Sequence, residues 1–101
     1  MEGLEMTCFE IISAVGSARS CYVEAIQAAK KGDFDKADEL MDEGKKLFQD
    51  GHKFHKALIE SEASGEKLET GLLLVHSEDQ MMSAEVLEIT ARELIELYRN
   101  K

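Results

Sequence analysis

The sequence contains no proline and no tryptophan, and only two cysteines among its 101 residues. Because proline is the residue that breaks helices most strongly, its absence favours long helices. No apolar run approaches the ~20 residues that cross a bilayer. The N-terminal stretch also lacks the basic segment and continuous apolar core of a secretory signal peptide. We therefore expect a cytoplasmic protein that does not insert into a membrane.

The two cysteines, Cys8 and Cys21, are 13 positions apart within one expected helix. At 1.5 Å per residue this separation is about 20 Å along the helix axis, which is too far for a disulfide. We expect both thiols to be reduced core residues, as is usual in cytosolic proteins.

Positive charge is also scarce: the chain has 12 lysines and arginines against 21 aspartates and glutamates, for a net charge of −9. This excess opposes binding to nucleic acid or to an anionic membrane, and it suits a partner protein with a basic docking face. With 44% apolar and 33% charged residues, the composition favours a helical bundle over a disordered chain. We expect residues 1–101 to form a single domain.

Apolar residues recur at helical spacing in three segments, 2–31, 34–60 and 66–98. Gly32 is a typical helix C-cap and Asp33 a typical N-cap, so the first two helices should be antiparallel neighbours joined by a tight turn. The polar segment 60–66 predicts a second loop. Small side chains at 14–20 permit close approach of another helix or of a bound group. The fold class predicted is all-α, an antiparallel three-helix bundle.

The third expected helix carries two apolar seams, each with alternating spacings of three and four residues. The first seam comprises Leu72, Val75, Asp79, Met82, Val86 and Ile89, and the second comprises Ala84, Leu87, Ala91, Leu94 and Tyr98. The step from Met82 to Ala84 turns the helix by roughly 200°, so the seams face nearly opposite directions. One seam can pack on the chain's own helices. The other needs a second surface, and we expect this to be another copy of the chain.

Asp79 occupies a position in the first seam where an aliphatic residue would be expected. A buried unpaired carboxylate costs several kcal/mol, so it must be partnered, protonated or bound to a cation. Around a cyclic axis its symmetry mates would converge and would require a cation or a shared proton. Asp79 is therefore a candidate metal ligand at an oligomer axis, and the alternative is an exposed aspartate at the rim of the interface.

His76 lies three residues before Asp79, roughly 60° round the helix, and so borders the first seam. A single histidine on a helix is often an ordinary half-exposed residue. Here, however, it opens a polar break, residues 76–80, inside a helix that is otherwise apolar along its seams. We therefore treat His76 as a candidate functional residue.

His52 and His55 are three residues apart and could share a metal ion in principle. Since no cysteine or carboxylate stands at matching spacing, we expect His55 to lie at the core edge and His52 in solvent. The sequence also has no phosphate-binding glycine loop with a lysine, no nucleophile elbow, no paired-cysteine zinc pattern and no His-Glu-x-x-His helix. A self-contained nucleotide-using enzyme is not indicated.

The run LLLVHSEDQMM at residues 72–82 resembles the phosphorylation-site helix of the lactose/cellobiose-type enzyme IIA of the bacterial phosphoenolpyruvate-dependent sugar phosphotransferase system (PTS). The resemblance extends over nearly the whole chain, in order and with the spacing of that family. Its other segments are ARS at 18–20, EA at 24–25, AAKKGDF at 28–34 and EASGEK at 62–67.

This resemblance implies a homotrimer of three-helix subunits. In it, His76 would accept a phosphoryl group on Nε2 from the histidine-containing phosphocarrier protein and pass it to the IIB component. The group would then reach a β-galactoside or β-glucoside entering through the IIC membrane permease. The resemblance also implies that Asp79 meets its two symmetry mates around one Mg²⁺ per trimer.

The chain departs from the commonest family pattern just after the histidine. Positions 77, 78 and 80 are usually alanine, glutamine and histidine, and here they are Ser77, Glu78 and Gln80. The change at position 80 alters the hydrogen bonding available to a phosphoryl group, and the charge of Glu78 would repel that group. Candidate donors to the phosphoryl oxygens are Ser77, Gln80 and helix N–H groups of a neighbouring subunit.

Two functions of different classes therefore follow. The first is a phosphotransferase component, a cytoplasmic phosphocarrier subunit with His76 as transient phosphohistidine that acts only with partner proteins. The alternative is a non-catalytic helical oligomerisation or regulatory adaptor derived from the same fold, which the substitutions at positions 77, 78 and 80 favour. A metal-storing bundle using His52 and His55 is a weaker third reading, because its ligand set is incomplete.

Overall fold

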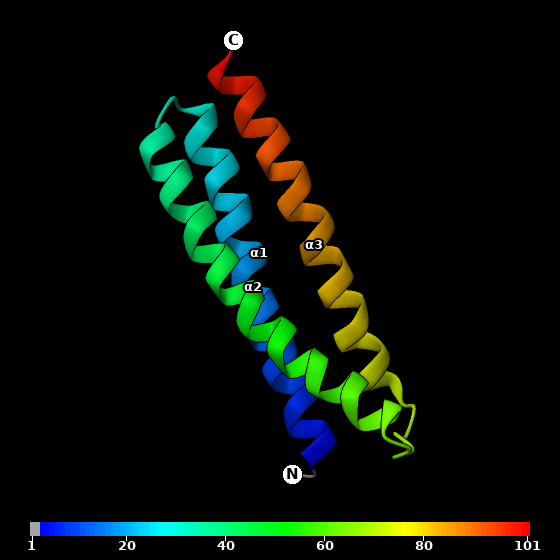
Figure 1. Cartoon of the computed structure of the whole chain (residues 1–101). Helices are drawn as coiled ribbons and strands as arrows, with labels where there is room; N and C mark the ends of the chain where they lie inside the picture. The colour runs from blue at the N-terminus through cyan, green and yellow to red at the C-terminus, as the bar shows by residue number, and fades with distance from the viewer. Residues whose placement is uncertain (1–2) are drawn as a thin grey trace.

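The computed structural model describes residues 3–101 and contains three α-helices in that range, with no strand. The helices are α1 (Gly3–Lys30), α2 (Phe34–Ala63) and α3 (Leu72–Arg99). They run up, down and up along a molecule of 51 × 22 × 20 Å, so that α1 and α3 point the same way (Figure 1). The predicted all-α fold of three helices is confirmed. Glu2, expected in the first helix, lies outside the described residues.

The turn between α1 and α2 forms as the sequence predicts. Gly32 has a φ of 82°, a left-handed conformation that glycine adopts without steric cost. Its N–H donates to the carbonyl of Ala29, and the N–H of Asp33 donates to the carbonyl of Ala28. The carboxylate of Asp33 then accepts from the N–H of Lys36 and caps α2.

The connection between α2 and α3 begins and ends later in the sequence than predicted. α2 continues through Ala63 instead of stopping near residue 60, and α3 begins at Leu72 instead of residue 66. Gly65, with a φ of 100°, ends the helical path after α2, and Leu68 packs on the core at this end of the bundle. The extended backbone of Gly71 then forms the N-cap of α3.

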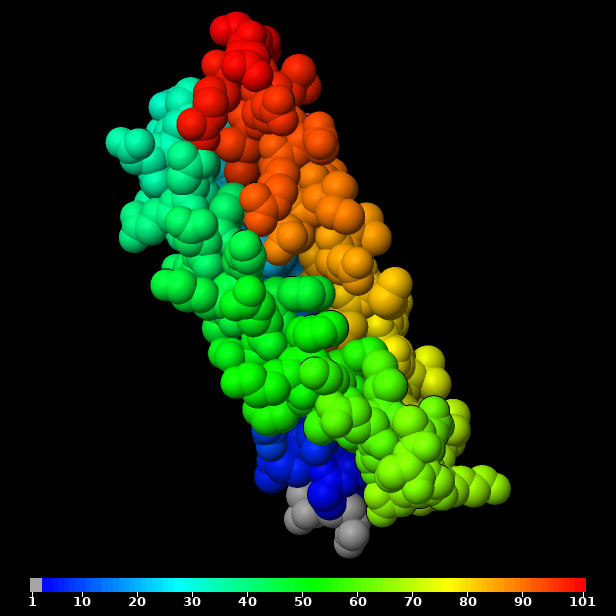
Figure 2. Space-filling view, in the orientation of Figure 1, coloured from blue at the N-terminus to red at the C-terminus, as the bar shows by residue number. Residues whose placement is uncertain are grey.

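α1 is the central helix, because it packs closely against both α2 and α3, whereas α2 and α3 touch each other least. On the face shown in Figure 2, α2 and α3 lie in front of most of α1, and its blue N-terminal part is visible near the lower end of the molecule. Eight residues of α1 are buried, including both cysteines, which are free thiols as predicted. Among the described residues, none of the helices combines the length and apolarity needed to span a bilayer.

Two glycines of α2 permit its close approach to α1. A Cβ atom at Gly44 would lie 2.5 Å from Cε1 of Tyr22, and one at Gly51 would lie 2.6 Å from Cγ1 of Val15. Since real Cβ atoms do not approach other atoms so closely, only glycine leaves enough space at these positions. The predicted close packing of the small-residue segment of the first helix is therefore confirmed, and the neighbouring helix contributes glycines to it.

Candidate functional site

The two seams of α3 face opposite sides, as predicted. The second seam turns inward: Ala84 and Ala91 are fully buried against α1, and Leu87, Leu94 and Tyr98 are half-buried. The first seam faces outward, and its apolar members are each 53% to 86% exposed. They are Leu72, Val75, Met82, Val86 and Ile89. A contiguous apolar stripe of this kind on a single chain is typical of a surface that another protein covers.

Asp79 lies in the middle of this outward stripe and is exposed on the single chain. Within residues 3–101 no three histidine, cysteine, aspartate or glutamate side chains are grouped so that they could hold a metal ion. A cation at Asp79 would therefore need ligands from other copies of the chain. The rim position and the axial position predicted for Asp79 both place it at the surface of one subunit.

His76 is exposed on the flank of α3 between the inner seam and the outward stripe. It is the fifth residue of the helix, so the regular helix fixes its direction. An exposed imidazole with a free ring nitrogen can act as a nucleophile toward an electrophile brought by a partner. The three substituted positions near it, 77, 78 and 80, each turn out to be engaged in a hydrogen bond.

Ser77 points inward and is fully buried on the packed side of α3. Its hydroxyl donates to the carbonyl of Leu74, at 2.8 Å, one turn earlier in α3. The prediction that Ser77 contacts a phosphoryl group on His76 does not agree with this placement, because the hydroxyl lies on the packed side of the helix. The small inward side chain instead occupies little space on the packed side of α3.

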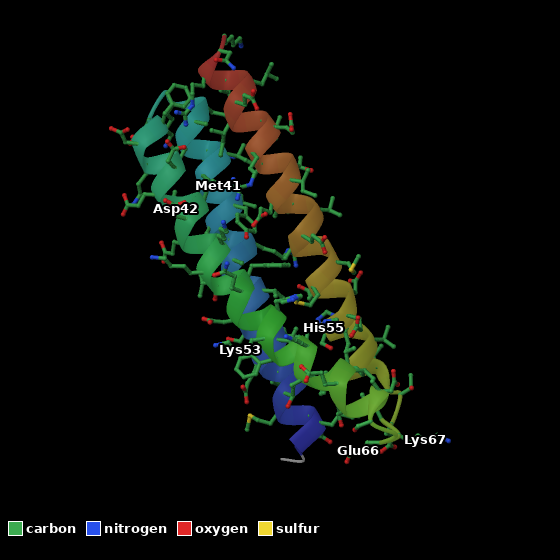
Figure 3. All side chains as sticks on the ribbon, viewed as in Figure 1. Met41, Asp42, Lys53, His55, Glu66 and Lys67 are labelled. Atoms are coloured by element: carbon green, nitrogen blue, oxygen red, sulfur yellow. The ribbon has the colours of Figure 1, made fainter. Side chains whose placement is uncertain are left out.

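Glu78 points toward α2, where its Oε1 lies 2.6 Å from Nε2 of His55. Two positions along a helix correspond to about 200°, so Glu78 is directed away from His76. Figure 3 shows His55 between α2 and α3, whereas Lys53 projects from the opposite side of α2. The expected repulsion between Glu78 and a phosphoryl group on His76 is therefore not supported by the geometry.

The pairing of His55 with Glu78 also refines the expectation for the two histidines of α2. His52 is exposed and His55 is half-buried at the edge of the core, as predicted. Sequence reasoning missed the carboxylate partner because it lies 23 residues away on another helix. No periodicity within either helix indicates such a contact.

Gln80 lies one helical turn after His76 and on the same flank of α3. Its Oε1 accepts a hydrogen bond from Nη1 of Arg19 on α1, at 2.5 Å. Both side chains are half-buried. The predicted candidate Gln80 is thus held beside His76 by a residue 61 positions earlier, whose role the sequence reasoning did not identify.

A second polar contact joins α1 and α3 further along the bundle. The hydroxyl of the fully buried Tyr22 donates to Oε2 of Glu88 at 2.9 Å, and Arg92 lies 3.8 Å from the other carboxylate oxygen. Burial, with the hydrogen bond to Glu88 and its charge, raises the pKa of the Tyr22 phenol above its usual value. The phenol therefore stays protonated and fixes the register of α3 on α1.

Comparison with known proteins assigns the fold and the sequence to one family. The sequence-family model for the PTS lactose/cellobiose-specific IIA subunit matches residues 6–99. The lichenan-specific phosphotransferase enzyme IIA component of Bacillus subtilis is 40% identical over 97 residues, covering 96% of this chain and 88% of that protein.

Two solved structures agree with this assignment. The PTS cellobiose-specific enzyme IIA from Bacillus anthracis superposes with a TM-score of 0.97 at 41% identity, covering 99% of this chain and 92% of that one. The IIA(chitobiose) of Escherichia coli, solved in complex with HPr, superposes with a TM-score of 0.84 at 33% identity, covering 99% and 97%. The chain therefore belongs to the lactose/cellobiose-specific IIA family of the bacterial sugar phosphotransferase system.

Proposed function

We propose that this chain accepts a phosphoryl group on Nε2 of His76 from the histidine-containing phosphocarrier protein HPr and passes it to a IIB component. The observation that carries the proposal is the exposed imidazole on a fold that superposes on a IIA protein solved with HPr. The acidic surface, with a net charge of −9, suits partners with basic docking faces.

The transfer would proceed as two displacements. The lone pair of His76 Nε2 attacks phosphorus, the N–P bond of the donor phosphohistidine breaks, and its electron pair returns to the donor nitrogen. The second displacement repeats this step from His76 to the acceptor. Because such reactions depend chiefly on in-line positioning and charge stabilisation, few protein groups are needed. An imidazole on a regular helix supplies the positioning.

We further propose that three copies pack through the outward stripe of α3 and that the three Asp79 carboxylates meet at the axis around one Mg²⁺. Support comes from the exposed apolar side chains on both sides of Asp79 and from the preference of Mg²⁺ for oxygen ligands. One subunit offers one carboxylate there, so the site would form only on assembly. The ion would neutralise charge at the interface, and no step of the phosphoryl transfer passes through it.

The alternative, a non-catalytic helical adaptor, rested on the three substitutions after His76. The structure removes part of that argument, because Glu78 is tied to His55 on the far side of the helix and His76 stays exposed. The sugar is recognised by the membrane component, so for this chain we propose only a cytoplasmic role in the uptake of a β-linked glucoside or galactoside.

Phosphorylation of His76 is tested by incubating the chain with phosphoenolpyruvate, enzyme I and HPr, followed by intact-mass and peptide mass spectrometry. We expect one acid-labile phosphate per chain on the peptide that contains His76. His76→Gln should abolish uptake without changing the circular dichroism spectrum, whereas the matched control His52→Gln should label normally. Continued labelling of His76→Gln would refute the assignment, and absence of labelling in the wild type would favour the adaptor.

The axial site has its own test in sedimentation and metal analysis. Asp79→Leu replaces a costly buried charge by apolar packing, so we expect it to retain or strengthen the trimer and to lose bound Mg²⁺. Asp42→Leu, on the exposed face of α2, serves as the control and should change neither property. A wild-type chain that sediments as a monomer at micromolar concentration would contradict the trimer even if His76 is phosphorylated.

A further inference from the structure

Gln80 is placed to reach a group carried by His76. Residues four apart on a helix are neighbours, with Cβ atoms about 5–6 Å apart. Helical side chains also lean toward the N-terminus, so the amide of Gln80 leans toward the turn that holds His76. Ser77 and Glu78 are turned to other sides of α3 by their contacts with Leu74 and His55. Gln80 is therefore the polar neighbour on the flank of His76.

Arg19 fixes which end of the Gln80 amide faces it. A guanidinium group has only donors, so the amide atom that Nη1 of Arg19 meets at 2.5 Å must be the carbonyl oxygen Oε1. The NH₂ group of Gln80 is thereby directed away from Arg19, and within residues 3–101 neither of its hydrogens has a hydrogen-bond partner. The contact converts a freely rotating amide into an oriented donor.

The charge of Arg19 is also available on this flank. Among the described residues Arg19 forms no ion pair, whereas Arg92 and Arg99 pair with Glu88 and Asp38. A half-buried guanidinium next to Gln80 thus adds positive charge on this flank of α3 in an otherwise acidic chain. Such a charge favours an anionic group through both Coulomb attraction and hydrogen bonding.

We infer that Gln80 is a phosphoryl-contacting residue and that Arg19 is its positioning residue. The NH₂ group of Gln80 donates to an oxygen of the phosphoryl group on His76, and Arg19 holds the amide in that orientation. This inference rests on the proposed phosphorylation of His76. Gln80 moves no proton: the bond from phosphorus to the donor nitrogen breaks, the bond to His76 forms, and the amide stabilises the charge on the equatorial oxygens.

Gln80→Glu separates the contact from the fold. The carboxylate keeps an acceptor for Arg19 and preserves the link between α1 and α3, but it loses the NH₂ donors and adds negative charge beside the phosphoryl group. We expect an unchanged or higher melting temperature and a phosphotransfer rate from HPr that is lower by ~10²-fold, in the range found for removal of one donor to a developing anion. Gln27→Glu, an exposed position of α1, adds the same charge elsewhere and should transfer at the wild-type rate.

Two further variants test the orientation. A neutral imidazole has one acceptor and one donor, so Gln80→His should lose far less activity than Gln80→Glu. Arg19→Met frees the amide and removes the charge, so we expect the transfer rate to fall by about tenfold and the phosphohistidine to hydrolyse faster, with the larger effect on kcat rather than on KM for HPr.

These measurements separate failure of the inference about Gln80 and Arg19 from failure of the proposed phosphorylation of His76. If the wild type takes no phosphate on His76, both statements fall. If the wild type is labelled and Gln80→Glu transfers at the wild-type rate, the phosphoryl contact of Gln80 is overturned while the carrier function stands. If Arg19→Met lowers the melting temperature but leaves both the transfer rate and the phosphohistidine lifetime unchanged, Arg19 is only a structural link.

Discussion

The α1–α2 pair and α3 are attached to the molecule in different ways. α1 and α2 are joined by a tight turn and approach each other so closely that Gly44 and Gly51 leave no space for a side chain. α3 packs on α1 through small inward residues. It touches α2 less, through apolar side chains of the shared core and through polar contacts such as His55 with Glu78 and Asp38 with Arg99. The α1–α2 pair supports α3, and α3 presents the exposed His76 and the exposed apolar stripe.

This difference means that the two regions should respond to different substitutions. A closely packed interface is sensitive to volume, because one extra methyl group has no space to occupy. The polar contacts between α2 and α3 join partly exposed charges, and removing such a charge has a weak effect because solvent screens it. Substitutions in the two regions test that contrast.

The largest effect is expected from Gly51→Val and Gly44→Val in the α1–α2 interface. A Cβ at these positions would lie 2.6 Å from Val15 and 2.5 Å from Tyr22, and both neighbours are fully buried. Since overpacking costs roughly 1–3 kcal/mol and occasionally more, we expect each variant to lose about 3 kcal/mol of unfolding free energy. Urea denaturation at a fixed protein concentration measures this loss.

Gly16→Ala is the control for these two variants. Gly16 lies in α1, and a Cβ there would meet nothing within 4 Å. Alanine is the better helix former, so stability should rise by roughly 0.5–1 kcal/mol. A loss as large as that of Gly51→Val would show that the need for glycine is not confined to the α1–α2 interface.

A smaller effect is expected from Tyr22→Phe, which removes the hydrogen bond to Glu88. A bond to a charged partner contributes roughly 1.5–3 kcal/mol, so we expect a loss of about 2 kcal/mol near pH 7. The raised pKa of Tyr22 means that the unfolded chain loses this proton first as the pH rises. The wild type should therefore lose stability above pH ~10, where tyrosine ionises in the unfolded state.

Thermal unfolding between pH 7 and pH 11 checks this prediction. The difference in stability between wild type and Tyr22→Phe should be constant below pH ~10 and should shrink above it. A difference that grows at high pH would mean that the phenol is not held in its neutral form by burial and by Glu88.

The smallest effect is expected from Glu78→Gln between α2 and α3. The variant removes the charge from a partly exposed pair, and such pairs contribute about 0–1 kcal/mol. The rate of phosphotransfer from HPr should stay within about twofold of the wild-type rate, because the Glu78 side chain points roughly 200° around the helix axis from that of His76. A tenfold gain in transfer rate would instead indicate that Glu78 does repel the phosphoryl group.

The sequence was informative where a residue acts on its own neighbourhood. Gly32 and Asp33 end one helix and begin the next through local hydrogen bonds, and the two seams of α3 follow from periodicity alone. The boundaries at Ala63 and Leu72 were missed. Before Ala63 the glutamates and the alanine are good helix formers, so no residue there signals the end of the helix. Before Leu72 the chain is not helical, and Leu68 packs on the core.

The candidate site was predictable only in part, because some of its contacts are local in sequence and others join residues far apart in the chain. His76, Asp79 and Gln80 are close in sequence, so helical spacing indicated their relation. The partners of the site come from elsewhere: Arg19 is 61 residues from Gln80 and His55 is 23 residues from Glu78. Such contacts depend on the angle and register of packed helices, which no pattern within one helix determines. The inward direction of Ser77 likewise became clear only from its complete burial.

The up, down and up order of the helices has an electrostatic consequence for the end of the molecule near His76. The N-termini of α1 and α3 and the C-terminus of α2 all lie at that end (Figure 1). Each helix terminus carries the equivalent of about half an elementary charge, positive at the N-terminus and negative at the C-terminus. Two positive ends and one negative end together leave a net partial charge of about +0.5 at this end of the bundle. In a polypeptide this rich in carboxylates, the backbone dipoles thus offset part of the negative potential at the end of the bundle that carries His76, which favours a phosphoryl group there.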